Sequence, residues 1–148
     1  MAQIQTIAAG DVTVKKIIGA LTVDEWLRDV DDFFLSHHVT KNLVLDLSEG
    51  SLEHLTYDDI IRITDRVRMY AHSRAGGKTA IVAPTDLEYG ISRILGAFAK
   101  IRAVPFDTQV FRTLSEAAEW IGVEKLPSLE EDACGAVHWA NAIINRNR

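Results

Sequence analysis

Hydrophobic and polar positions along the chain follow two periods in alternation. Short runs rich in Val, Ile, Leu and Phe are typical of β-strands, and longer stretches with an apolar residue at every third or fourth position are typical of α-helices. The strand-like runs are 4–8, 12–18, 42–47, 79–83 and 108–111, and the helical stretches are 23–37, 57–72, 87–101 and 115–121. The chain therefore alternates strand and helix with a repeat of roughly 30 residues.

A hydroxyl residue stands three positions before an acidic residue at five places, and each pair opens an apolar-periodic stretch. This spacing is the signature of a capping box, in which the hydroxyl accepts from the third helical N–H and the acid reaches back to the N–H of the cap residue. The five pairs are Thr22/Glu25, Thr56/Asp59, Thr85/Glu88, Thr113/Glu116 and Ser128/Glu131. The first four pairs predict the starts of four helices, and the fifth opens a C-terminal stretch.

The first two strand-like runs flank Ala9, Gly10 and Asp11, a turn-forming triplet that predicts an antiparallel hairpin at the sheet edge. The run 42–47 is almost entirely apolar, as expected for a strand covered on both faces. Residues 1–123 are therefore predicted to form one α/β domain. Its mixed, mostly parallel sheet has about five strands including the N-terminal hairpin, and four helices flank it.

Each of the first three helical stretches has a predicted inner stripe. The stripes are Val23, Trp26, Leu27, Val30, Phe33 and Phe34; then Tyr57, Ile60, Ile61, Thr64, Val67 and Ala71; then Leu87, Ile91, Ile94, Leu95, Phe98 and Ile101. The other face of the first helix carries one basic residue, Arg28, and five acidic residues, so we expect an acidic, solvent-exposed surface. The acidic residues are Asp24, Glu25, Asp29, Asp31 and Asp32.

Beyond Gly122 the composition changes, and residues 124–148 are predicted to be a C-terminal helical tail. An acidic trio at 130–132 precedes an apolar stripe of Ala133, Val137, Ala140 and Ile144, which Gly135 weakens as a helix. A short helix is marginal unless it docks on something. We expect the tail to cover the domain's own sheet or to pair across a two-fold axis in a homodimer.

Composition restricts the class of protein. The chain has 148 residues, 47% hydrophobic and 25% charged, which is ordinary for one globular domain. A net charge of −5 and a pI near 5.5 argue against general attraction to nucleic acid or to anionic membranes. No apolar run approaches the roughly 20 residues of a membrane span, and the N-terminus lacks a basic region, so we expect a cytoplasmic protein. Cys134 is the single cysteine, which leaves no internal disulfide or cysteine cluster.

The motifs contain no catalytic, cofactor-binding or metal-binding set of residues. Gly76-Gly77-Lys78-Thr79 resembles the end of a phosphate-binding P-loop, but His72 replaces its first glycine and the order of helix and strand is reversed. Ser92, in Gly90-Ile91-Ser92-Arg93-Ile94, lies inside a helical stretch and lacks the second glycine of a nucleophile elbow. The five histidines have no ligand at metal-binding spacing, and residues 29–32 lack the glycine and closing Glu of a calcium loop. We therefore expect a protein that is not an enzyme and needs no cofactor.

The order of several motifs resembles the STAS-like family, small bacterial relatives of the anti-sigma-factor antagonists (SpoIIAA-like), whose fold is also compared to CRAL-TRIO lipid-binding domains. The resemblance covers about residues 4–122 and rests on Gly19-x-Leu21-Thr22, Leu45-Asp46-Leu47-Ser48, Ala80-Ile81-Val82-Ala83-Pro84, Tyr89-Gly90-x-x-Arg93 and Val110-Phe111-Arg112-x-x-x-Glu116-Ala117-x-x-Trp120. The resemblance implies a mixed sheet flanked by helices, and a non-enzymatic function that depends on binding partners or ligands.

The resemblance also draws attention to Thr56. In switching members of the broader family, a Ser at the start of the second helix, within an Asp-Ser-x-Gly pattern, is phosphorylated by a kinase partner. The matching stretch 53–58 keeps a hydroxyl at Thr56 but lacks the flanking Asp and the Gly. A phosphate there would meet a helix N-terminus, but also the like charges of Asp58, Asp59 and Glu49. Thr56 is therefore either a switch residue or a plain N-cap.

A candidate ligand or partner face follows from the expected topology, because ligands of such sheets collect beyond the carboxyl ends of the parallel strands. The residues expected there are Ser48, Ser51, His54, Thr56, Thr85, Asp86, Tyr89 and Thr113. Helix starts that cap themselves with carboxylates are poor phosphate sites, so this face favours a neutral or apolar ligand or a protein surface. Four aromatic residues could line a cavity or belong to the ordinary core: Tyr57, Tyr89, Phe98 and Phe106.

Three functional classes follow, in order of preference. The first is a non-enzymatic regulatory or protein-interaction module with an unidentified protein partner. The alternative is a module that binds a small apolar or lipid-like ligand in a pocket at the carboxyl ends of the strands. An enzyme comes last, because no nucleophile, base and orienting group occur together.

Overall fold

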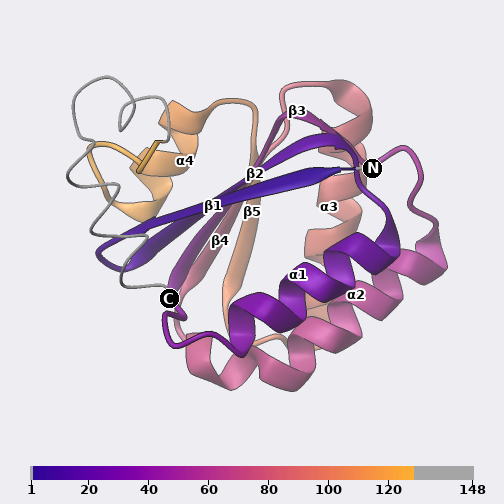
Figure 1. The fold of residues 1–148 in the computed structure, drawn as a ribbon, viewed down its shortest axis with the longest axis horizontal. Helices are drawn as coiled ribbons and strands as arrows, with labels where there is room; N and C mark the ends of the chain where they lie inside the picture. The colour runs from indigo at the N-terminus through magenta and orange to yellow at the C-terminus, as the bar shows by residue number, and fades with distance from the viewer. Residues whose placement is uncertain (1, 129–148) are drawn as a thin grey trace.

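A computed structural model describes residues 2–128 of the chain and contains one five-stranded sheet (Figure 1). The strands lie side by side in chain order, β1 (Gln3–Ala9), β2 (Val12–Ala20), β3 (Asn42–Ser51), β4 (Lys78–Val82) and β5 (Asp107–Phe111). β1 and β2 pair antiparallel, and every later pair is parallel. The predicted mixed, mostly parallel sheet with an N-terminal hairpin is confirmed.

Four α-helices cover the two faces of the sheet unequally. α1 (Val23–Phe34), α2 (Tyr57–Tyr70) and α3 (Asp86–Ile101) lie on one face, and α4 (Leu114–Ile121) lies on the other (Figure 1). A short 3-10 helix, η1 (Ala71–Arg74), continues α2. Crossovers between neighbouring parallel strands are right-handed, and the strand order always steps in the same direction, so the three crossover helices must share one face.

Side chains alternate between the two sides of each strand, and the sheet therefore has a hydrophobic core on each face. On β3, Leu43, Leu45 and Leu47 belong to the core under α1, α2 and α3, whereas Val44 belongs to the core under α4. The smaller core contains Ile7, Val12, Val14, Val44, Ala80, Val82, Ala117 and Ile121. The central strand is therefore apolar on both sides, which explains its continuous hydrophobic run.

Two of the predicted capping boxes form completely. Thr22 accepts from the backbone N–H of Glu25 at 3.2 Å, and the Glu25 carboxylate accepts from the Thr22 amide at 3.0 Å. Thr56 and Asp59 make the same two bonds with the same lengths. At α4 the Thr113 hydroxyl caps the helix, but the acid accepts from that hydroxyl and not from the cap amide. All three threonines fix a helix start at the predicted residue.

The capping box predicted at Thr85 is wrong. Its side chain makes no cap hydrogen bond; the hydroxyl instead donates to the carboxylate of Glu88. The other oxygen of Glu88 accepts from the amide of Leu52 at 3.2 Å, on a different connection. A tertiary contact has thus replaced the local one.

Element ends differ from the predictions where tertiary pairing intervenes. α1 ends at Phe34 and not at 37, and the Ser36 hydroxyl donates to the Phe33 carbonyl at 2.7 Å. β3 runs on to Ser51, because residues 49–51 pair with 18–20 after a shift of register. Gly50 permits this close pairing, since a Cβ there would lie 2.9 Å from the carbonyl oxygen of Ile17.

Parts of the predicted inner stripes are exposed. Tyr57, Leu87 and Ile101 have relative exposures of 66%, 53% and 74%. They lie at the first or last turn of their helices. The inner side of α2 includes Ile63 at 1% exposure, a position outside the predicted stripe. The apolar period therefore assigned burial wrongly at terminal turns and at this middle position.

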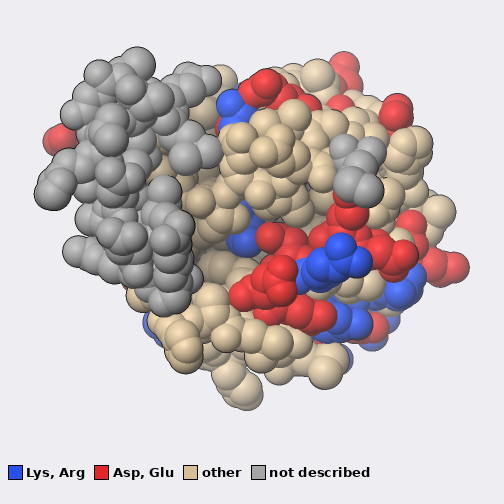
Figure 2. Space-filling model, viewed as in Figure 1, with Lys and Arg blue, Asp and Glu red and all other residues tan. Residues whose placement is uncertain are grey.

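The acidic surface expected on α1 is partly neutralised. Asp29 accepts from the buried Lys15 of β2 at 2.9 Å. Asp31 accepts from Arg66 of α2 at 2.7 Å and from the Tyr70 hydroxyl at 2.8 Å. Figure 2 accordingly shows basic side chains among the acidic ones in the region of α1 and α2. These carboxylates tie α1 to the sheet and to α2.

The predicted helical tail falls mainly outside the described residues. Residues 124–128 are described, and Leu126 packs against the core under α4. The rest of the tail, including Glu131, lies beyond residue 128. The division at residue 123 and the tail-built homodimer stay predictions.

Replacement of Gly77 by Ala is expected to destabilise the fold by about 3 kcal/mol or more. The added Cβ would lie 1.9 Å from the carbonyl oxygen of Lys41, so backbone must move. Gly90→Ala is the control, because its Cβ meets no atom within 4 Å on an exposed helix and the change should stabilise by about 0.5–1 kcal/mol. Urea unfolding followed by circular dichroism measures both; equal stabilities would contradict this packing.

Stability should depend on pH through Asp31. Hydrogen bonds from Tyr70 and Arg66 lower the pKa of Asp31 below its ordinary value of 3.8. A lowered folded-state pKa stabilises the fold above the ordinary pKa, and that stabilisation is lost as the pH falls through the folded-state pKa. Asp31→Asn should therefore lower the Tm at pH 7, with a difference from wild type that shrinks below about pH 4. The exposed neighbour Asp32→Asn serves as control and should show no such convergence.

Candidate functional site

The predicted site residues gather mainly at one edge of the sheet, which we call the carboxyl edge: the ends of β3, β4 and β5 and the helix starts that follow them. Because these strands are parallel, their ends meet at one edge. Ser51 ends β3, and His54 and Thr56 lie in the connection to α2. At the ends of β4 and β5 lie Thr85, Asp86, Tyr89 and Thr113.

Ser48 is separated from this group by the alternation of its strand. Its hydroxyl donates to Asp46 at 2.5 Å, and both residues line an open groove of about 450 Å³ on the α4 side of the sheet. Ile7, Val14 and Leu114 also line this groove. The structure therefore does not place Ser48 with Thr56.

Glu88 connects two of the helix starts. Its side chain is buried, with 6% exposure, and its two oxygens accept from the Thr85 hydroxyl and from the Leu52 amide. The bond to Leu52 ties the connection before α2 to the first turn of α3. In the sequence Glu88 had the pattern of a capping acid, and nothing local distinguished it from Glu25.

Arg112, at the end of β5, organises the other part of the edge. It donates to Asp86 at 2.9 Å and to the Pro84 carbonyl at 3.1 Å. Its guanidinium lies 4.0 Å from the centre of the Tyr89 ring, a cation–π contact. Arg112 was not among the predicted site residues, although it belongs to the last family motif. Its tertiary position beside Asp86 and Tyr89 is what makes it part of the edge.

Thr56 is exposed at the N-terminus of α2. Its hydroxyl and amide are both used in the capping box with Asp59, and Asp58 adds a second carboxylate in the same turn. His54 lies 3.7 Å from Glu53 on the connection before it. The amides of Thr56 and Asp59 are therefore already bonded within the helix start.

Large apolar side chains are exposed at the same edge. Tyr57 and Leu87 lie in the first turns of α2 and α3, with 66% and 53% exposure, and Leu114 at the start of α4 is 41% exposed. Tyr57 and Leu87 were predicted to lie in the core because they fit the helical period. Their exposure beside Thr56 and Thr85 gives the edge an apolar component.

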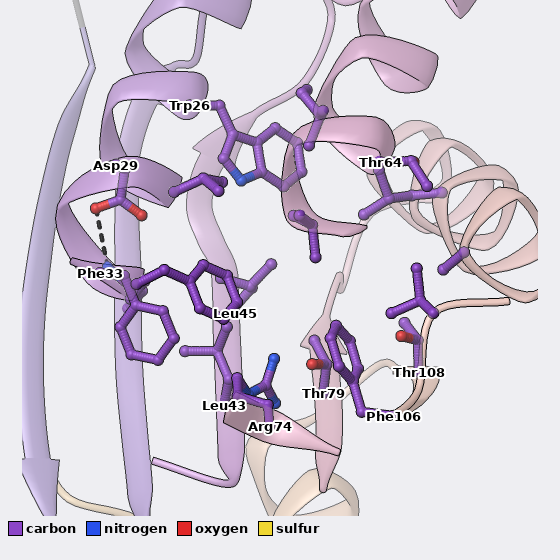
Figure 3. A pocket seen from close by; sticks show the side chains of 18 residues that line it. Trp26, Asp29, Phe33, Leu43, Leu45, Thr64, Arg74, Thr79, Phe106 and Thr108 are labelled. Carbon is purple, nitrogen blue, oxygen red and sulfur yellow. Dashed lines mark hydrogen bonds and ion pairs between the residues drawn. The ribbon is translucent and has the colours of Figure 1, made fainter. Parts of the chain in front are cut away.

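A small apolar cavity lies elsewhere, at the amino ends of the parallel strands (Figure 3). It has a volume of about 70 Å³ and lies between the sheet and α1, α2 and α3. None of the residues predicted for the candidate face lines it. Among the four aromatic residues predicted as possible cavity walls, Phe106 contributes to it and Tyr57, Tyr89 and Phe98 do not.

Two general properties complete the description. Within residues 2–128, no three or more His, Cys, Asp or Glu side chains come together in a way that could hold a metal ion. No helix in this part of the chain has both the length and the apolar character needed to cross a bilayer.

Comparison with solved structures shows a SpoIIAA-like fold. An uncharacterized DUF3478-family protein with a SpoIIAA-like fold from Shewanella loihica PV-4 matches with a TM-score of 0.50 and 18% identity, over 81% of this chain and 93% of that one. An anti-sigma factor antagonist from Mycobacterium paratuberculosis matches with a TM-score of 0.50 and 13% identity, over 82% and 94%. No protein-family model and no curated protein matches the chain. The resemblance to STAS-like proteins is thereby confirmed for the fold.

Removal of the Glu88 carboxylate should destabilise the domain. Glu88→Ala leaves the Leu52 amide without its acceptor, and an unpaired group in the interior costs about 1–3 kcal/mol. Glu116→Ala, at the exposed start of α4, should change stability by about 0.5 kcal/mol or less. Urea unfolding gives both values, and hydrogen exchange of the Leu52 amide should accelerate only in the Glu88 variant. An unchanged exchange rate would show that this bond does not tie the two connections.

Proposed function

We propose that this chain is a non-enzymatic regulatory module that acts by binding a protein partner at its carboxyl edge. The partner contacts the exposed first turns of α2 and α3. Thr56 is the residue through which a modification alters that contact.

The observation that carries the proposal is the exposure of Tyr57 and Leu87 beside polar helix starts. Protein interfaces commonly combine a few large apolar or aromatic anchors with a polar rim, and Tyr and Arg are enriched among their energetically important residues. Arg112, held by Asp86 and stacked on Tyr89, adds a positioned cation to this edge.

The shared fold is consistent with such a role. The Mycobacterium paratuberculosis protein of the same fold is described as an anti-sigma factor antagonist, which names another protein as its target. We extend from it only the general mode of action, which is regulation through a protein contact.

The electrostatics of α2 suggest how Thr56 would act. A phosphate on its hydroxyl would add a charge of about −1.5 to −2 beside Asp58 and Asp59. It would also compete with the capping bond from the Asp59 amide. Repulsion within this first turn would change the surface that a partner meets, so phosphorylation is expected to release the partner.

The experiment uses the full chain, captured with its cross-linked partners from the source organism and compared quantitatively with variants. Leu87→Glu and Tyr57→Ala alter the carboxyl edge, whereas Met69→Glu alters an equally exposed apolar side chain at the other end of α2. A central anchor contributes about 2 kcal/mol or more, so edge variants should bind the partner roughly 30-fold more weakly. The Met69 variant should bind like wild type.

Phosphorylation is tested with the same captured partner. Thr56→Glu should weaken binding, Thr56→Ser should retain it, and intact mass spectrometry should find a phosphate that Thr56→Ala abolishes. If the edge variants lose binding but no phosphate is found on Thr56, the proposed interface is supported and the phosphorylation switch is contradicted. Equal binding by wild type, Leu87→Glu and Tyr57→Ala would overturn the proposed interface.

A further inference from the structure

The cavity at the amino ends of the strands has walls that are mostly apolar and a floor that carries charge. Trp26 lies at one end of it, and Arg74, Thr79 and Phe106 lie together at the other (Figure 3). Leu43, Leu45 and Val104 are among its aliphatic walls. None of these residues belongs to the carboxyl edge, so this site is independent of the proposed function.

Arg74 is buried, with 1% exposure, and its side chain is held by backbone. Nε donates to the Thr40 carbonyl at 3.2 Å, and Nη2 donates to the carbonyls of Lys41 and Lys78 at 3.0 and 2.9 Å. Its guanidinium lies 4.2 Å from the centre of the Phe106 ring. Its position and orientation are therefore determined before any ligand arrives.

The charge of Arg74 lacks a partner within the described chain. Burial lowers its pKa to about 10, opposed by the charge of Asp11, so Arg74 stays protonated at neutral pH. Among residues 2–128 no carboxylate forms an ion pair with it. The other charged groups at the cavity are Lys15 and Asp29, which neutralise each other at 2.9 Å. Among the charged side chains that line the cavity, Arg74 is therefore the one without an ion pair to a described residue, an arrangement that favours a bound anion.

Two hydrogen-bonding groups at the charged end remain unused. Nη1 of Arg74 makes no hydrogen bond to another described residue, and Figure 3 shows a guanidinium nitrogen directed into the cavity. The hydroxyl of Thr79 also lines the cavity, is buried, and has no partner among the described residues. A buried hydroxyl without a hydrogen-bond partner destabilises the fold, and an acceptor placed between these groups would remove that penalty.

We propose that this cavity binds a short-chain aliphatic monocarboxylate. Its carboxylate accepts from Nη1 of Arg74 and from the hydroxyl of Thr79, and its carbon chain lies against the apolar walls. A carboxylate suits this floor because both of its oxygens lie at one end of an otherwise apolar molecule. A phosphate would place further charged oxygens against apolar walls and incur a desolvation penalty.

The volume restricts the ligand's size. The cavity measures about 70 Å³, roughly half of the 150 Å³ cavity that takes up benzene. It therefore accommodates about four or five non-hydrogen atoms, as in acetate or propionate. A ligand of that size reaches only modest affinity, so we expect a Kd of about 1 mM.

The test is a titration of the full ¹⁵N-labelled chain with sodium propionate at constant ionic strength. The indole N–H signal of Trp26, in the cavity wall, is the reporter. A saturable shift is expected with propionate, and neither propionamide nor sodium chloride should produce it. No saturable shift up to about 50 mM, well above the expected Kd, would overturn the site. If propionamide shifts the Trp26 signal as much as propionate does, the role of the charge is contradicted. If sodium chloride shifts it as much, the preference for a carboxylate is contradicted.

Matched variants separate binding from folding. Thr79→Val keeps the shape of the side chain and should fold normally, yet bind propionate about tenfold more weakly, as expected for a lost hydrogen bond to a charged group. Ser92→Ala removes the other buried hydroxyl without a partner, which does not line the cavity, and should bind like wild type. Arg74→Lys should lose binding if it folds. Wild-type affinity in Thr79→Val would contradict the proposed contact even if the Arg74 variant does not fold.

Discussion

The buried guanidinium of Arg74 is the interaction on which the amino-terminal end of this sheet depends. It donates to carbonyls on two segments, the connection into β3 and the start of β4. Those carbonyls and the Phe106 ring replace the water that a charged group loses on burial. Gly77 allows the two segments to approach, because any Cβ there would overlap the Lys41 carbonyl. The cavity behind the guanidinium exists because this arrangement holds the strand starts and the helix ends in place.

The two ends of the sheet consequently differ in chemistry. At the carboxyl edge, Thr56 and Thr113 cap the third amide of the helix that each precedes, and carboxylates accompany them. That edge offers exposed apolar and charged side chains. At the amino end, unused side-chain donors line a small, mostly apolar cavity. A protein contact suits the first end, and a small anionic molecule suits the second.

Apolar periodicity predicted the helices well and their buried faces less well. The inner side of α3 buries Glu88 and Ser92, whereas Leu87 and Ile101 are exposed. A polar residue can occupy an inner position when a partner from another element serves it, as the Leu52 amide serves Glu88. The pattern of apolar residues contains no information about such partners. The same reason explains Asp29 and Asp31, which had the pattern of an exposed acidic face but bond to Lys15, Arg66 and Tyr70.

In the candidate site, too, the order of elements located some residues and the tertiary contacts determined others. Thr56, Thr85, Asp86, Tyr89 and Thr113, which the order of helices and strands proposed for the candidate face, lie at helix starts beyond the strand ends. That order did not identify Arg112, whose contacts join β5 to the start of α3, and it included Ser48, which alternation turns to the α4 side.

The sequence by itself determined the order of elements, the hairpin and the four helix starts after Thr22, Thr56, Thr85 and Thr113. Periodicity, turn residues and capping pairs act within a few positions of the chain, so they can be recognised without the tertiary structure. Only the tertiary structure decided which polar groups are buried and which apolar groups are exposed. It also decided that Arg74, Thr79 and Phe106 line one cavity. Those outcomes depend on contacts between residues far apart in the chain, such as Arg74 with the Thr40 carbonyl, and a local pattern does not specify them.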